Sequence, residues 1–77
     1  MQEKEFLIEL GAEIARLRKK KKLSQQDLAL EIEIDKQSIT RIEKGRTNPT
    51  SLTLLKISKV LDVPVAALFS FQKRVVK

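Results

Sequence analysis

Apolar residues recur at helical spacing near the start of the chain. Four of them follow one another at steps of three, four and three residues: Leu7, Leu10, Ile14 and Leu17. This pattern predicts an amphipathic helix over residues 6–22. Since a glycine inside a helix costs about 1 kcal/mol relative to alanine, we expect the firm part of this helix to begin just after Gly11.

Two shorter helices are predicted next, and each has its own N-cap residue. Ser24 opens the first, with Asp27 as the acidic partner of a capping box. Asp35 opens the second, which begins at Lys36 and ends before Gly45, a residue suited to a left-handed stop. The inner faces of the two helices carry Leu28, Ile32, Ile39 and Ile42.

The second half of the chain predicts two more helices. Ser51 follows the turn residues 46–50 and is the expected cap of a fourth helix, and a short fifth helix is expected after Pro64. Their inner faces carry Leu54, Ile57, Ser58, Leu61, Val65, Leu68 and Phe69. No segment alternates convincingly as a strand. The sequence therefore predicts an all-α fold, a compact five-helix bundle that forms one domain over residues 1–77.

The composition narrows the classes of function. A length of 77 residues, 42% of them hydrophobic, with two glycines and two prolines, suits one compact helical domain. Because the chain has no cysteine and no histidine, we expect no disulfide, no metal and no cofactor. No nucleophile–base pair or phosphate-binding glycine loop is present, so an enzyme is not expected. No apolar run approaches membrane-spanning length, which favours a soluble, cytoplasmic protein.

The charge balance is basic. Sixteen lysines and arginines against ten acids give a net charge of +6. Such a balance favours polyanionic partners through counterion release and long-range steering. Many small basic proteins bind no nucleic acid, so the net charge indicates a partner only together with the positions of the charged residues.

A longer pattern surrounds the two capped helices. Residues 23–45, LSQQDLALEIEIDKQSITRIEKG, resemble the helix-turn-helix of the Cro and phage-repressor family, and the resemblance continues through NPTSLTLLKISKVLDVPVAALF. It implies a helix-turn-helix over about residues 24–44 and a DNA-binding transcriptional regulator, either a repressor or a controller protein. Small regulators of this type include phage repressors, restriction-modification controller proteins and antitoxins. An antitoxin or adaptor that uses the same fold mainly to bind protein is the alternative.

The resemblance also implies which residues meet DNA. In this fold the second helix of the pair enters the major groove, and four of its residues are expected to read bases: Lys36, Gln37, Thr40 and Arg41. Arginine and lysine match the acceptors of guanine, and glutamine can pair with adenine. Contacts to phosphates are expected from Gln25, Ser38, Lys44, Arg46, Thr47 and Asn48. An ordinary solvated surface is the alternative for all of them.

Contacts inside the domain are implied in the same way. Gln25 is expected to brace Lys36, and Arg18 is expected to form a structural ion pair with Glu43. The family usually has glycine in the turn where this chain has Glu33. Either that turn adopts another geometry here, or the domain tolerates a strained backbone.

Family members typically form two-fold dimers on pseudo-palindromic operators, with recognition helices about 34 Å apart. The resemblance puts the interface near the last two helices, and the candidate residues are Leu55, Val65, Leu68 and Phe71. Packing within the monomer is the alternative for Leu68. The tail, residues 71–77, departs from the common ending and either extends a dimer contact or frays. The expected partners are double-stranded DNA and a second copy of the chain, with no membrane and no small-molecule effector.

Overall fold

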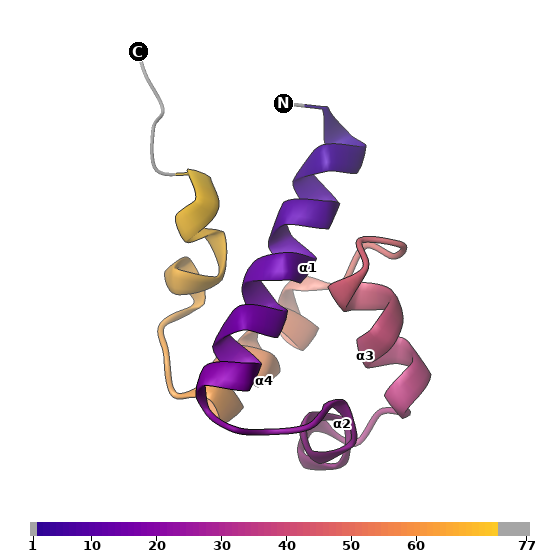
Figure 1. Cartoon of the computed structure of the whole chain (residues 1–77), viewed down its shortest axis with the longest axis vertical. Coiled ribbons are helices and arrows are strands. Elements are labelled where there is room, and N and C mark those ends of the chain that lie inside the picture. The colour runs from indigo at the N-terminus through magenta and orange to yellow at the C-terminus, as the bar shows by residue number, and fades with distance from the viewer. Residues whose placement is uncertain (1, 73–77) are drawn as a thin grey trace.

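Five helices follow one another along residues 2–72, the part of the chain that this computed structural model describes (Figure 1). They are α1 (Glu3–Lys20), α2 (Gln25–Ile32), α3 (Lys36–Glu43), α4 (Ser51–Leu61) and the 3-10 helix η1 (Val65–Gln72). Helix α1 runs between η1 on one side and α3 on the other, and α2 packs against α3 and α4 (Figure 1). The predicted all-α, five-helix fold is confirmed within these residues.

Helix α1 begins earlier than its apolar pattern predicts and runs straight through Gly11. Its first turn is closed by the backbone N–H of Gln2, which donates to Glu5 Oε1 at 3.2 Å. Gly11 is buried, and a Cβ added there would lie 2.6 Å from the backbone oxygen of Glu43. The expectation that the firm helix starts after Gly11 was wrong. This glycine is where α1 and α3 approach each other closely, so its benefit in packing outweighs its cost in helix propensity.

The interior collects the inner faces of all five helices. Its buried apolar residues are Leu10, Ile14, Leu28, Ala29, Ile32, Ile39, Ile42, Leu54, Ile57, Leu61 and Leu68. Ser58 is also buried, and its hydroxyl donates to the Leu55 carbonyl at 2.8 Å, one turn back along α4. The helical periodicity of the sequence thus identified the core faces correctly, Ser58 included.

Three residues other than glycine have left-handed backbone where a helix ends, the first being Lys22, with φ 64°, after α1. Glu33 has φ 60° at the end of α2, and Asp62 has φ 59° at the end of α4. At the ends of α2 and α4 a backbone N–H of the next residue reaches back into the helix, Ile34 to Ala29 and Val63 to Ser58, both at 3.0 Å. The sequence left two possibilities for the turn between α2 and α3, another geometry or a strained backbone, and the structure has the strained backbone. Glu33 adopts the left-handed conformation that glycine usually occupies at a helix end.

The start of α4 and the nature of η1 differ from the prediction. Thr50, not Ser51, is the N-cap of α4, since Thr50 Oγ1 accepts from the backbone N–H of Thr53 at 3.1 Å. The predicted fifth helix is present, but it is wound as a 3-10 helix with a kink at Phe69. Ser51 therefore occupies the first helical position rather than the cap.

The three phenylalanines of the chain hold α1 and η1 together. The Phe6 ring lies 6.0 Å from that of Phe69 and 5.5 Å from that of Phe71, measured between centroids. About two turns beyond Phe6 along α1, Glu13 Oε2 accepts a hydrogen bond from the Ser70 hydroxyl at 2.9 Å. These contacts fix the N-terminal half of α1 against the last helix. Of the tail, Phe71 and Gln72 belong to η1, whereas residues 73–77 lie outside the described residues.

Candidate nucleic-acid interface

Side-chain caps fix the starts of α2 and α3. Ser24 Oγ accepts from the backbone N–H of Asp27, and the Asp27 carboxylate accepts from that of Ser24, both at 2.9 Å. Asp35 Oδ1 accepts from the backbone N–H of Ser38 at 2.9 Å, which starts α3 at Lys36. The predicted capping box and the predicted cap of α3 are both confirmed.

Hydrogen bonds from the neighbouring serines lower the pKa of both carboxylates. The backbone N–H of Ser24, and next its hydroxyl, lower the pKa of Asp27 below the usual 3.8. The hydroxyl of Ser38, and next its backbone N–H, lower the pKa of Asp35 in the same way. A charged carboxylate at each helix start also interacts favourably with the helix dipole.

One face of α3 is buried and the opposite face is open. Ile39 is 0% exposed and Ile42 5%, and both face the core. The side chains of Lys36, Gln37 and Arg41 are exposed, and they lie within the first two turns of the helix. These three predicted base readers are therefore available at the surface, as the prediction requires.

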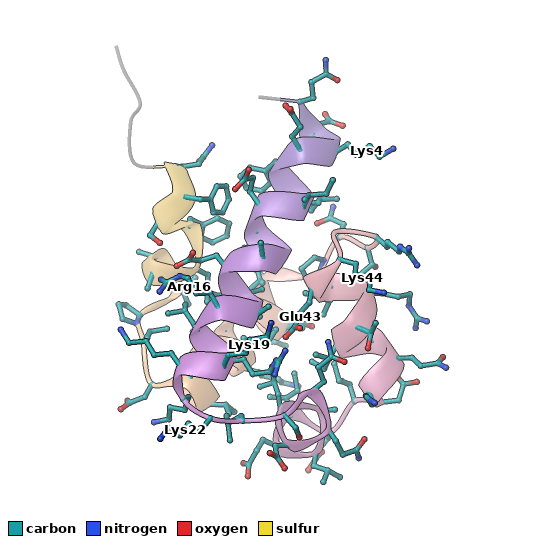
Figure 2. All side chains as sticks on the ribbon, viewed as in Figure 1. Lys4, Arg16, Lys19, Lys22, Glu43 and Lys44 are labelled. Carbon is teal, nitrogen blue, oxygen red and sulfur yellow. The ribbon has the colours of Figure 1, made fainter. Side chains whose placement is uncertain are left out.

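Four of the six predicted phosphate ligands lie at the C-terminal end of α3 and in the loop after it: Lys44, Arg46, Thr47 and Asn48. Lys44, Arg46 and Asn48 are exposed, and Lys44 points outward from the helix end (Figure 2). Gly45 has φ 73° and lies against the backbone of Ile8 in α1. A groove of 240 Å³ between α3 and the start of α4 is lined by Ser38, Arg41, Ile42, Thr47, Asn48, Pro49, Thr50 and Thr53, together with Ile34. Two half-buried members of the predicted set, Ser38 and Thr47, thus lie beside Arg41 and Asn48.

Thr40 does not belong to the open face. It is half-buried and turned toward α2, where its hydroxyl lies 2.8 Å from Gln25 Oε1 and 3.2 Å from the Lys36 carbonyl oxygen. The expectation that Thr40 projects outward beside Arg41 was therefore wrong, because its only O–H is used within the protein. Sequence position alone places residue 40 at the border of the face, and only the α2–α3 contact decides its direction.

Gln25 also has partners other than the expected one. Its carboxamide joins α2 to the far end of α3, with Nε2 donating to Glu43 Oε1 at 2.8 Å and Oε1 accepting from Thr40. The expected contact between Gln25 and the Lys36 side chain was wrong. Gln25 binds Glu43 and Thr40 instead, and so holds α3, the helix that carries Lys36.

The predicted ion pair between α1 and α3 is confirmed. Arg18 Nε and Nη2 donate to the two carboxylate oxygens of Glu43 at 2.6 and 3.0 Å, and Nη1 donates to the Leu23 carbonyl at 2.8 Å. The two side chains are 8% and 5% exposed. Hydrogen bonding to Glu43 raises the pKa of Arg18 above its ordinary value, although burial opposes it. Glu43 lies between α1 and α3, on the inner side of the helix from which Lys44 points outward (Figure 2).

The predicted dimer residues divide into two groups. Leu68 is 0% exposed and belongs to the monomer core, so it offers no surface to a second copy. Leu55 is 37% exposed, while Val65 and Phe71 are half-buried. Leu52, three residues before Leu55 on α4, is 60% exposed and was missed by the sequence analysis. The signal that could have found it is the spacing of two leucines on the outer face of an otherwise amphipathic helix.

Other kinds of site are not apparent in the described part of the chain. Within residues 2–72, no helix combines the length and the apolar character needed to cross a membrane. The same residues bring together no group of three acidic, histidine or cysteine side chains suited to hold a metal ion.

Two helices at a steep angle (Figure 1), joined by a tight turn and linked by half-buried polar contacts, with the second exposing a polar face, define a helix-turn-helix domain. Comparison with known proteins agrees. Residues 14–68 match the family model described as helix-turn-helix, and the chain belongs to this helix-turn-helix family.

Several relatives resemble most of the chain. The control protein C.MunI from Mycoplasma sp. is 38% identical over 64 residues, which cover 82% of this chain and 86% of the relative. The uncharacterized HTH-type transcriptional regulator y4dJ from Sinorhizobium fredii is 35% identical over 54 residues, 70% of each chain. Among solved structures, the restriction-modification controller protein C.AhdI from Aeromonas hydrophila has a TM-score of 0.80 at 32% identity, covering 82% of this chain and 96% of the other.

Proposed function

We propose that this protein is a sequence-specific, double-stranded DNA-binding transcriptional regulator that inserts α3 into the major groove. The observation that carries the proposal is the open face of α3, with Lys36, Gln37 and Arg41 exposed while Ile39 and Ile42 are buried behind them. A rigid helix with its polar face outward is the element that the major groove admits.

The base-reading role falls to three of the four predicted residues. Arg41 and Lys36 carry donors for the N7 and O6 acceptors of guanine, and Gln37 can both donate to and accept from adenine. Each good pair is worth about 1–3 kcal/mol of discrimination against the wrong base. Thr40 is left out because its hydroxyl donates within the protein.

The phosphate-binding role belongs to the residues around this helix. Lys44 and Arg46 supply positive charge next to the groove that contains Ser38, Thr47 and Asn48. Gln25 supplies an amide donor at the start of α2. Contacts of this kind set the register of the protein on the duplex and make binding salt-dependent.

We propose in addition that two copies bind a pseudo-palindromic site as a homodimer. The candidate interface consists of the exposed leucines of α4, Leu52 and Leu55, and of two half-buried residues of η1, Val65 and Phe71. Dimerisation would place two recognition helices about 34 Å apart, one turn of the double helix. It would also supply the selectivity that one short α3 lacks.

The similarity to controller proteins of restriction-modification systems supports a controller or repressor role in the cytoplasm. Occupancy of the operator would then follow the protein's own concentration, without a small-molecule effector. An antitoxin or adaptor that binds mainly protein is the competing function, and it predicts no salt-sensitive DNA binding.

The test is a gel-shift titration on duplexes selected from a random pool, repeated across salt concentrations. Arg41→Ala should weaken binding to the selected site and relax the preference at one base position. Lys44→Ala should weaken binding to all sequences alike and flatten the salt dependence by about one charge. Lys59→Ala removes the same charge at the far end of α4 and serves as the matched control. Equal losses for Arg41→Ala and Lys44→Ala on selected and random DNA would reject the assignment.

A further inference from the structure

The carboxamide of Gln25 belongs to a chain of polar contacts that starts at the ion pair between Arg18 and Glu43. Arg18 donates to Glu43, Glu43 accepts from Gln25 Nε2 at 2.8 Å, and Gln25 Oε1 accepts from Thr40 at 2.8 Å. The partners come from three helices, α1, α2 and α3. The inner two are almost closed to solvent, whereas Gln25 and Thr40 are half-buried.

The chemistry of these groups allows only one orientation of the Gln25 amide. A guanidinium can only donate and an ionised carboxylate can only accept. Glu43, held by Arg18, therefore requires the NH₂ group of Gln25 on its side. The Gln25 carbonyl must then face Thr40, which can supply a donor. The reversed amide would bring the carbonyl oxygen against a carboxylate oxygen and lose a charge-assisted hydrogen bond.

This orientation leaves one N–H of Gln25 for another molecule. Within residues 2–72, Nε2 donates to Glu43 only, so its second hydrogen has no protein acceptor. Thr40, in contrast, uses its one hydroxyl hydrogen toward Gln25 or the Lys36 carbonyl. A phosphate oxygen accepts and cannot donate. Gln25 can therefore bind a phosphate directly, while Thr40 can act on it only through Gln25.

We propose that Thr40 is a positioning residue: together with Glu43 it fixes the Gln25 carboxamide so that the free N–H is presented to a backbone phosphate of DNA. This role rests on the proposed DNA binding. It makes the phosphate contact of α2 depend on a side chain of the recognition helix, and it connects that contact with the buried ion pair of α1 and α3.

The matched variants are Thr40→Val, which keeps the shape and loses the hydroxyl, and Thr40→Ser, which keeps the hydroxyl. Thr40→Val should bind the selected duplex about two- to tenfold more weakly, the effect of one hydrogen bond. Thr40→Ser should restore binding to near the wild-type level. In a Gln25→Ala background, Thr40→Val should cause no further loss, because the residue through which it acts is absent.

A phosphate-specific readout separates positioning from general stability. A series of selected duplexes, each with one neutral methylphosphonate linkage, locates the phosphate that Gln25 contacts: on the duplex that lacks this charge, Gln25→Ala no longer weakens binding. On the same duplex Thr40→Val should not weaken binding either, although it weakens binding to the unmodified DNA. In NMR spectra of the free protein, the side-chain amide signals of Gln25 should shift in Thr40→Val and stay in place in Thr40→Ser.

The outcomes distinguish this inference from the proposed function. If the wild type binds with sequence preference but Thr40→Val binds equally well, only the inference fails. It also fails if the losses from Thr40→Val and Gln25→Ala multiply in the double variant. If the wild type shows no sequence preference and no salt dependence, the proposed function fails first, and the role of Thr40 fails with it.

Discussion

Replacing Arg18 by alanine removes the positive half of an ion pair whose side chains are 8% and 5% exposed. Three hydrogen bonds disappear, two to the Glu43 carboxylate and one to the Leu23 carbonyl. Glu43 then keeps only the amide of Gln25 among its described hydrogen-bond partners. The variant thus leaves a charge nearly enclosed by protein between α1 and α3.

The size of the effect follows from that enclosure. Removing one partner of a buried ion pair costs about 3–5 kcal/mol, because the remaining charge is left without compensation. A small domain has a total stability of about 5–15 kcal/mol, so this loss is a large fraction of it. For 60–100 residues, each kcal/mol corresponds to a shift of about 4–8 °C in Tm. A decrease in Tm on the order of 12–40 °C is therefore expected.

Urea unfolding followed by far-UV circular dichroism measures this loss, with Arg16→Ala as the matched control. Arg16 forms an ion pair with Glu13 on the same helix, but its side chain is 58% exposed. Exposed pairs contribute little, so the control should unfold close to the wild type. A double variant, Arg18→Met with Glu43→Leu, should recover part of the stability because no unpaired charge remains. If Arg18→Ala costs no more than Arg16→Ala, the reasoning from burial is refuted.

Four further predictions follow from particular contacts. Gly11→Ala should destabilise the domain by about 1–3 kcal/mol in urea unfolding, because the added Cβ meets fixed backbone of α3; a neutral effect would mean that α1 can shift. Glu33→Gly should raise stability by about 1 kcal/mol, since glycine adopts the φ of 60° without strain, and a lower Tm would contradict this. The lowered pKa values of Asp27 and Asp35 mean that their stabilising effect is complete above the unfolded value of 3.8 and is lost as the pH falls through the folded values. Tm measured from pH 7 down to about pH 2.5 should therefore fall below about pH 4, less steeply in Asp35→Asn than in the wild type. Leu55→Lys should shift sedimentation toward the monomer and weaken operator binding together; unchanged sedimentation would remove α4 from the interface.

Local chemistry made much of the fold predictable. The caps at Ser24 and Asp35, the stop near Gly45 and the apolar faces depend on neighbours within a few residues, and all of them are present. The errors at the start of α4 and in the winding of η1 concern a shift of one residue and a choice between two similar helices. Such choices depend on small energy differences that periodicity does not register.

The misjudged residues have contacts far apart in sequence. Gly11 looked like a weak point of a helix, because the approach of α3 that requires it comes more than thirty residues later. Leu68 fitted both a core and an interface, and only the packed bundle shows that it has no surface left. Thr40 lies at the edge of a helical face, where its direction depends on Gln25, 15 residues earlier.

The exposed face of α3 depends on these distant contacts for its position. An eight-residue helix is too short to be stable alone in water, so its placement must come from what it touches. Ile39 and Ile42 bury one side of α3 but would tolerate some sliding, since apolar contacts have little directional preference. The hydrogen bonds of Glu43 to Arg18 and Gln25 are directional. They join α3 to α1 and α2, because Arg18 precedes Glu43 by 25 positions and Gln25 precedes it by 18. These polar contacts therefore determine how Lys36, Gln37 and Arg41 are presented, while the apolar core supplies most of the stability.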